Sequence, residues 1–204
     1  MITLGPRLGL MDMPAGRRVH SKPTPRAGGI AIWVVFVVAV FMLDAAAIFT
    51  PETGDGRLAG FLAASSVLLI FGILDDRGGI PALVKLGGQI LAAALYWFFS
   101  DSNKEVLAGV SIPLWVDLLV WVVWIVLLIN AYNLIDGLDG LCGGLAWISL
   151  AGILLAAQAL QVGGDRVDQV VIMMAAIMGF LFYNRSPARL FLGDAGSMIL
   201  GLFI

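Results

Sequence analysis

Charge is scarce in this sequence: 13% of its 204 residues are Asp, Glu, Lys or Arg, whereas 60% are hydrophobic. Soluble domains usually carry about twice that charged fraction, so the composition excludes an ordinary water-soluble fold. The net charge of -2 provides no basic surface of the kind that binds nucleic acid, and we expect no nucleic-acid partner. The mean hydropathy of +0.99 instead predicts a chain that resides in the lipid bilayer.

Cysteine and histidine are almost absent as well. The single Cys142 excludes a disulfide within the chain, and its apolar, glycine-rich neighbourhood favours the role of a small apolar side chain. His20 is the only histidine. We expect no secretory signal peptide, because residues 1–29 are polar, basic and contain proline.

Long apolar runs occupy most of the remaining sequence. A helix needs about 20 apolar residues to cross the hydrocarbon core. Runs near this length are predicted at residues 30–49, 58–74, 83–99, 113–129, 141–160 and 168–184, and a shorter one begins near Ala195. We therefore predict an all-α, polytopic transmembrane helix bundle of six to seven spans, with residues 1–204 forming a single integral membrane domain.

Basic residues are unevenly distributed between the two predicted sides of the membrane. One side holds most of the 12 basic residues: Arg7, Arg17, Arg18, Lys22, Arg26, Arg77, Lys85, Arg185 and Arg189. The other side holds only Arg57, Lys104 and Arg166. Because cytoplasmic loops are enriched in Lys and Arg, this distribution predicts a cytoplasmic N-terminus.

Acidic and amide side chains gather at span ends on that same predicted side. They occur in FGILDDR, in NAYNLIDGLDG and in FLGDAGS, and comprise Asp75, Asp76, Asn130, Asn133, Asp136, Asp139, Asn184 and Asp194. Each segment alone could be a helix end, a turn or an acidic first helical turn. Taken together they favour a cation, because clustered carboxylates repel by about 4 kcal/mol per pair at 4 Å. Asp and Asn oxygens suit Mg²⁺, which often bridges protein carboxylates to phosphates.

Two further aspartates, Asp44 and Asp117, lie near the outer ends of apolar runs. We expect both to reach interfacial water, where a charge is less costly than at mid-bilayer. A transporter or channel is the less favoured interpretation of the ionisable residues, because such proteins place them near the membrane centre.

The stretch RRVHSKPTPRAGG at residues 17–29 supplies positive charge on the side of the carboxylates. Contact with anionic lipids is the ordinary explanation for such residues. Two prolines and Gly28-Gly29 favour a shaped segment instead, and cations beside a Mg²⁺ site are typical of phosphate binding.

Four blocks of this sequence resemble the polyprenyl-phosphate N-acetylhexosamine-1-phosphate transferases, glycosyltransferase family 4. They are RRVHSKPTPRAGG at 17–29, LDDR at 74–77, NAYNLIDGLDGL at 130–141 and FLFYNRSPARLFLGDAGS at 180–197. The resemblance implies transfer of N-acetylhexosamine-1-phosphate from a UDP-sugar to undecaprenyl phosphate, with UMP as the second product. It further implies a bacterial inner-membrane, multi-pass enzyme whose active face is cytoplasmic; dimerisation is left open.

The resemblance also implies residue roles. Asp194 and Asn133 would bind Mg²⁺, for which Mn²⁺ could substitute. The catalytic set would comprise Asp75, Asp76, Asp136, Asp139 and Lys85: the first two position or deprotonate the lipid phosphate, the next two line the nucleotide and metal region, and Lys85 contacts phosphate. Phe191 would stack on uracil, and the remaining substrate-binding set would comprise His20, Arg26, Asn130 and Asn184.

HSKPTPR and LDDR look more like the branch that starts O-antigen and teichoic acid synthesis than the peptidoglycan branch. N-acetylglucosamine is therefore the expected sugar, and phospho-MurNAc-pentapeptide transfer is the alternative. Members of the family also carry a helix ahead of the first block, and further helices and a His- and Arg-rich loop after GDAGS. We therefore expect a partial chain, for which an inactive membrane remnant is a further alternative.

Overall fold

The computed structural model describes residues 1–13, 23–43, 56–100, 112–161 and 163–204. Five helices there are long and apolar enough to cross a membrane: α3 (Arg57–Gly78), α4 (Ala82–Phe99), α5 (Leu114–Ile135), α6 (Leu141–Ala159) and α7 (Asp165–Asn184). Two shorter helices, α1 (Gly28–Leu43) and α8 (Gly193–Phe203), complete the bundle. The prediction of an all-α polytopic membrane protein is confirmed.

Several predicted span boundaries are wrong. Helix α3 continues beyond residue 74 to Gly78, and α5 continues beyond residue 129 to Ile135. Asp75, Asp76 and both asparagines of NAYN therefore lie on helices rather than after them. Polar residues are tolerated in these last turns because their side chains bond to neighbouring helices. The end of the predicted span 30–49 and Asp44 lie outside the described residues.

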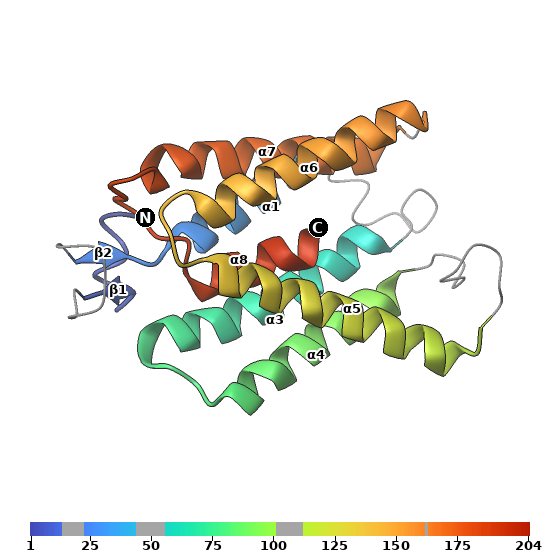
Figure 1. The fold of residues 1–204 in the computed structure, drawn as a ribbon, viewed down its shortest axis with the longest axis horizontal. Coiled ribbons are helices and arrows are strands. Elements are labelled where there is room, and N and C mark those ends of the chain that lie inside the picture. Colours follow the sequence, from blue (N-terminus) through green and yellow to red (C-terminus); the bar gives the residue numbers. More distant parts are fainter. Residues whose placement is uncertain (14–22, 44–55, 101–111, 162) are drawn as a thin grey trace.

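Helix α8 lies at the centre of the bundle (Figure 1), packed against α1, α3 and α5. Every residue from Ala195 to Leu202 is buried. Small residues allow this close approach: a Cβ on Gly29 would collide with the backbone of Gly196, and one on Gly72 with the backbone of Ala195. Small residues are common at helix contacts in membranes for this reason. An apolar segment of only 11 residues thus becomes the axis around which longer helices pack.

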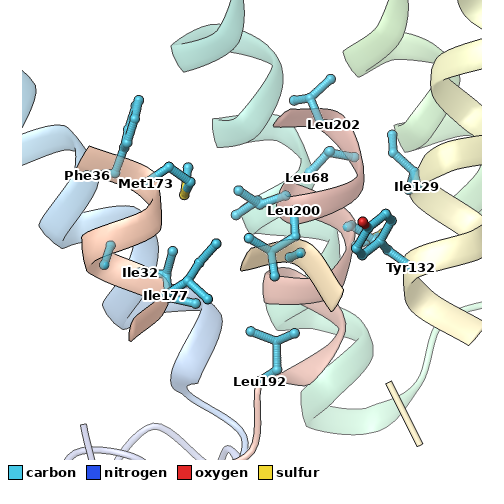
Figure 2. Close-up of a cluster of buried hydrophobic side chains, with 14 of the residues drawn as sticks. Ile32, Phe36, Leu68, Ile129, Tyr132, Met173, Ile177, Leu192, Leu200 and Leu202 are labelled. Atoms are coloured by element: carbon cyan, nitrogen blue, oxygen red, sulfur yellow. The ribbon is translucent and has the colours of Figure 1, made fainter. Parts of the chain in front are cut away.

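Apolar side chains fill the space on both sides of α8 (Figure 2). Leu200 and Leu202 of α8 lie near Leu68 of α3 and Ile129 of α5, all four in the buried core. On the other side, Ile32 and Phe36 of α1 face Met173 and Ile177 of α7. Three rings also join α1, α3 and α8 edge to face: Phe36, Phe61 and Phe203, with centroids 5.1–5.5 Å apart. The core therefore fixes α8 relative to both helix groups.

The N-terminal residues fold against one end of the bundle. Two short antiparallel strands, β1 (Met11–Asp12) and β2 (Thr24–Pro25), pair with Met11 opposite Pro25. Leu10 is buried, and the Arg77 Nε of α3 donates a hydrogen bond to the Leu8 carbonyl at 2.9 Å. The described part of the basic N-terminal stretch is therefore shaped by contacts with the rest of the chain.

The expectation that Asp117 reaches interfacial water is wrong. Asp117 lies in the first turn of α5 with 0% of its surface exposed. Its Oδ2 accepts a 2.6 Å hydrogen bond from the indole Nε1 of Trp97 on α4, whereas its Oδ1 has no hydrogen-bond partner among the described residues. Packing of α4 against α5 thus supplies a partner that the sequence pattern did not indicate.

Candidate functional site

The polar segments singled out in the sequence meet at one end of the helix bundle. The α3–α4 connection, the α5–α6 turn, the start of α8 and the β1–β2 pair all lie at this end in Figure 1. Because α3 and α5 bring their last turns here while α4 and α8 begin here, residues more than 100 positions apart become neighbours. The predicted convergence of the three segments is confirmed, because Asp75, Asn133 and Asp194 all accept hydrogen bonds from one lysine.

That lysine, Lys85 in the first turn of α4, is the centre of the site. Its Nζ donates hydrogen bonds to Asp75 Oδ2 at 2.8 Å, to Asp194 Oδ2 at 2.8 Å and to Asn133 Oδ1 at 3.1 Å. The three acceptors come from α3, α8 and α5. The Lys85 and Asp75 side chains are mostly buried, with 17% and 14% of their surface exposed, whereas Asp194 is 31% exposed. Asp194 is therefore the carboxylate of this group that solvent reaches most easily.

Asn133 orients Asp194 from the other side. Its Nδ2 donates to Asp194 Oδ1 at 2.9 Å and to Ser197 Oγ at 2.9 Å. Three residues earlier on α5, Asn130 Nδ2 donates to Gln89 Oε1 of α4 at 2.7 Å. Residues three apart share a helix face, so the two asparagines join α5 to its neighbours. The substrate-binding role implied for Asn130 stays a prediction.

Asp76 holds the beginning of α8. Its Oδ1 accepts a hydrogen bond from the Asp194 backbone N–H at 3.1 Å, and its Oδ2 accepts one from Ala195 N–H at 3.4 Å. These are the second and third positions of α8, the two that a capping side chain ordinarily satisfies. The residue that precedes the helix, Leu192, makes no side-chain cap. A carboxylate there also complements the partial positive charge of the helix N-terminus.

Gly193 makes room for this carboxylate. Its φ is +77°, and a Cβ at this position would lie 2.6 Å from Asp76 Oδ2. A side chain at residue 193 would therefore be strained by the backbone angle and would also displace the capping group. The GD pair of GDAGS is therefore explained in part by its contact with Asp76.

Arg26 connects this network to the N-terminal residues. Its Nη2 bonds to Asp12 Oδ1 at 2.8 Å, and its Nη1 lies 3.7 Å from Asp76 Oδ1. The guanidinium is thus the nearest positive group to the Asp76 carboxylate among the described residues. His20, the other substrate-binding residue predicted in this stretch, lies outside the described residues.

Asp136 follows α5 directly and is half-buried. Burial raises the pKa of its carboxyl, and the negative charges of Asp194 and Asp76 add to this effect, whereas the positive charge of Arg26 opposes it. Together these causes raise the pKa to about 7. The carboxyl can therefore exchange a proton near neutral pH. The role predicted for Asp136, lining the nucleotide and metal region, stays a prediction.

Asp139 and Asn184 connect two loops. Asp139 Oδ2 accepts a hydrogen bond from the Ala188 N–H at 3.0 Å, across to the α7–α8 loop. The buried Asn184 side chain accepts from Gly140 N–H and donates to the Leu190 carbonyl, both at 2.9 Å. These contacts give both residues a structural task, and the substrate-related roles implied for them stay predictions.

Phe191 lies in the same α7–α8 loop, half-buried, with its backbone fixed on both sides. Its N–H donates to the Pro25 carbonyl at 2.8 Å, and its carbonyl accepts from Gly28 N–H at 2.9 Å. The ring is therefore attached to a rigid segment three residues from Asp194, as stacking on a base would require. The stacking itself stays a prediction.

The sequence analysis did not identify Gln89, Ser197 and Asp12. Their side chains form hydrogen bonds with the predicted site residues Asn130, Asn133 and Arg26. A signal was available for two of them. Gln89 lies four residues after Lys85 in an otherwise apolar helix, and Ser197 lies three residues after Asp194. Spacings of three and four place side chains on one helix face.

The donor set at this end of the bundle suits Mg²⁺. Two carboxylates and one amide oxygen converge on a single cationic nitrogen, so the site already accommodates positive charge. Among the described residues, no group of three or more His, Cys, Asp or Glu side chains forms a ready metal cluster. Mg²⁺ commonly uses one or two carboxylates and completes its shell with water and substrate phosphates. Asp194 and Asn133 fit such a partial set.

The chain is similar to several known proteins. Residues 58–204 match the family model described as glycosyl transferase family 4. A probable undecaprenyl-phosphate N-acetylglucosaminyl 1-phosphate transferase of Bacillus subtilis (strain 168) is 36% identical over 209 residues, covering 97% of this chain and 54% of the relative. A decaprenyl-phosphate N-acetylglucosaminephosphotransferase of Mycobacterium tuberculosis (strain ATCC 25618 / H37Rv) is 34% identical over 218 residues, covering 98% and 53%.

A phospho-N-acetylmuramoyl-pentapeptide-transferase of Streptococcus uberis is also similar, with 30% identity over 194 residues, 89% of this chain and 57% of the relative. The chain spans about half the length of the curated relatives that it matches.

Proposed function

The chain belongs to glycosyl transferase family 4, and we propose from this membership that it transfers N-acetylhexosamine-1-phosphate from a UDP-sugar to a polyprenyl phosphate. An oxygen of the lipid phosphate would attack the β-phosphorus of the nucleotide sugar. The bond between that phosphorus and the oxygen bridging to the α-phosphate would break, releasing UMP and leaving a lipid-diphospho-sugar. The lipid is proposed to be undecaprenyl phosphate, and the product to initiate a cell-surface polysaccharide.

The observation that carries this proposal is the clustering of Lys85, Asp75, Asn133 and Asp194 at one end of a membrane bundle. Joining two phosphates requires cations next to carboxylates that can hold them, at a place that both a lipid and a water-soluble nucleotide can reach. A helix end at the membrane surface meets that requirement better than a site at mid-bilayer.

The residues present suggest a division of tasks. Asp194 and Asn133 would hold Mg²⁺, which when bound neutralises charge on the diphosphate and fixes its orientation. Asp75, which faces Lys85 rather than the α8 backbone, is the better placed of the two neighbouring aspartates to act on the lipid phosphate. Asp76 is engaged with the N–H groups of α8, so we assign to it the positioning of Asp194.

N-acetylglucosamine-1-phosphate is the proposed group transferred. Five relatives whose names specify N-acetylglucosamine are 31–36% identical to this chain and cover 97–98% of it. Three relatives named as pentapeptide transferases are 30–32% identical and cover 89% of it. The second candidate function is therefore transfer of phospho-N-acetylmuramoyl-pentapeptide to the same lipid. We place the protein in the bacterial inner membrane with its active face in the cytoplasm, on the basis of the basic residues at that end.

The test is an assay in membranes that contain the protein, with MgCl₂, undecaprenyl phosphate and radiolabelled UDP-N-acetylglucosamine. We expect label to enter the organic phase as lipid-diphospho-sugar, with UMP formed in equal amount. UDP-N-acetylmuramoyl-pentapeptide supplied in a parallel assay distinguishes the second candidate. Absence of a lipid-linked product from either nucleotide sugar would contradict the proposed function.

Two variants connect the activity to the site. Asp194→Asn should reduce turnover by about 100-fold or more, because it removes a carboxylate at the reacting phosphates. Asp168→Asn is the matched control, since Asp168 is an exposed aspartate near the opposite end of the bundle, at the start of α7. Full turnover by Asp194→Asn would contradict the assignment of Asp194 as a metal ligand.

A further inference from the structure

Lys85 uses its full hydrogen-bonding capacity within the protein. An ammonium group has three N–H donors and no acceptor, and Lys85 Nζ has three acceptors within 3.1 Å: Asp75 Oδ2, Asp194 Oδ2 and Asn133 Oδ1. In this arrangement no donor of Lys85 is left for a substrate phosphate. A lysine that is to bind phosphate must therefore first leave at least one of these partners.

The two residues that suit a metal ion are engaged in the same way. Asp194 Oδ2 accepts a hydrogen bond from Lys85, and Asp194 Oδ1 accepts one from the Asn133 amide. Asn133 Oδ1 in turn accepts a hydrogen bond from Lys85. All three oxygen atoms that could become metal ligands thus already have donors. A cation can use them only after some of these hydrogen bonds are exchanged.

Electrostatics explain why Lys85 occupies this position. Asp75 and Asp194 both lie 2.8 Å from one nitrogen, so their carboxylates are close enough to repel strongly without a cation between them. The half-buried ammonium neutralises that repulsion and joins α3, α8 and α4. A divalent ion bound by the same oxygens would do the same, and then the ammonium would be repelled rather than attracted.

We propose that Lys85 and a divalent cation compete for the oxygens of Asp194 and Asn133, so that a bound cation displaces the ammonium from both residues. Displacement frees the ammonium to bind the phosphates of the nucleotide sugar. Metal binding and release of the Lys85 ammonium are thus a single exchange on the same oxygens. Lys85 cannot bind phosphate until the metal has replaced it. The inference rests on the proposed function for its substrate, but the competition itself is a property of these four side chains.

Competition has a thermodynamic signature that a purely structural lysine lacks. If Lys85 and the metal exclude one another from the same oxygens, removal of the ammonium must strengthen metal binding. We expect Lys85→Met, titrated with Mn²⁺ in detergent and followed by electron paramagnetic resonance, to bind Mn²⁺ about tenfold or more tightly than the unchanged protein.

Arg26→Met is the matched control. It also removes one positive charge beside this carboxylate cluster, but the guanidinium lies 3.7 Å from Asp76 and bonds to Asp12, away from the proposed metal ligands. We expect its Mn²⁺ affinity to change by less than about threefold, because only long-range repulsion is relieved. Equal tightening in both variants, or unchanged or weaker binding in Lys85→Met, overturns the exchange.

A second measurement needs no substitution and so does not depend on how well Lys85→Met folds. The protein is treated with a low dose of an amine-acylating reagent with and without Mg²⁺, and modified lysines are quantified by mass spectrometry. Lys22 and Lys104, the other two lysines, serve as internal references. Mg²⁺ should raise the acylation rate of Lys85 relative to these, since the displaced amine loses its contacts with Asp194 and Asn133. An unchanged or lower relative rate overturns the proposal.

The outcomes separate this inference from the proposed function. Sugar-phosphate transfer with neither tighter Mn²⁺ binding in Lys85→Met nor faster labelling of Lys85 refutes the exchange alone. Both signatures in a protein that transfers no sugar phosphate support the exchange and contradict the function.

Discussion

Replacement of Asp76 by alanine should release the first turn of α8 without touching the side chain of Asp194. The N–H groups of Asp194 and Ala195 are both accepted by the Asp76 carboxylate, and no preceding residue of α8 can accept them within a helix. A buried N–H left without an acceptor costs about 1–3 kcal/mol. For two such groups we expect a local destabilisation of about 2–4 kcal/mol, somewhat less than the sum because water can enter the loosened turn.

Amide hydrogen exchange measures this directly. At 1.4 kcal/mol per tenfold, the expected loss corresponds to exchange about 30- to 700-fold faster in a peptide covering residues 193–197. Asp76→Asn should fall between the unchanged protein and Asp76→Ala, because the amide keeps one acceptor but loses the charge that complements the helix N-terminus.

Asp75→Ala is the matched control, since Asp75 is the adjacent aspartate and contacts Lys85 but not the α8 backbone. It should leave exchange in residues 193–197 close to that of the unchanged protein. Unaltered protection in Asp76→Ala, or equal loss in both variants, would refute the capping role.

Three further outcomes are expected. Gly72→Ala should lower the melting temperature in detergent, because its Cβ would collide with the backbone of α8; Gly152→Ala, with nothing within 4 Å, should not. Folding raises the pKa of Asp136 from 3.8 to about 7, so the folded state favours the protonated carboxyl. The melting temperature of the unchanged protein without added metal should therefore fall as pH rises from about 4 to about 7, and Asp136→Asn should reduce this fall. Asp117→Leu should destabilise by about 1–3 kcal/mol because it removes the hydrogen bond between the Trp97 indole and residue 117, whereas Asp117→Asn, which keeps an acceptor oxygen, should not.

Much of this arrangement follows from the sequence by elementary rules. Apolar run length predicts the spans, and counting them assigns Asp75, Asn133 and Asp194 to one side of the membrane. The helix ends could not be predicted in this way. The length of an apolar run reflects the thickness of the hydrocarbon core, whereas a helix can continue beyond it into polar residues. Helix α5 ends at Ile135, six residues beyond its predicted end at residue 129, and Asn130 and Asn133 are therefore part of it.

The partners of individual polar side chains could not be predicted either. Asp76 contacts α8 across 118 positions of sequence, and nothing in LDDR distinguishes it from Asp75. The contact depends on how closely α3 and α8 pack, which glycine at position 72 permits. Asp117 is similar: its apolar neighbours in sequence suggest an exposed interfacial charge, but its partner is an indole on another helix.

The central position of α8 has a consequence for biosynthesis. Membrane helices are inserted in the order of synthesis, and α8 follows all five spanning helices of the described chain. Until residues 193–203 emerge, α3 and α5 are joined through α4 and not through α8. Asp75 and Asn133 then lack the carboxylate that completes their contact with Lys85. The contacts around Lys85 are therefore completed only when this short segment packs into a group of helices that is already in the membrane.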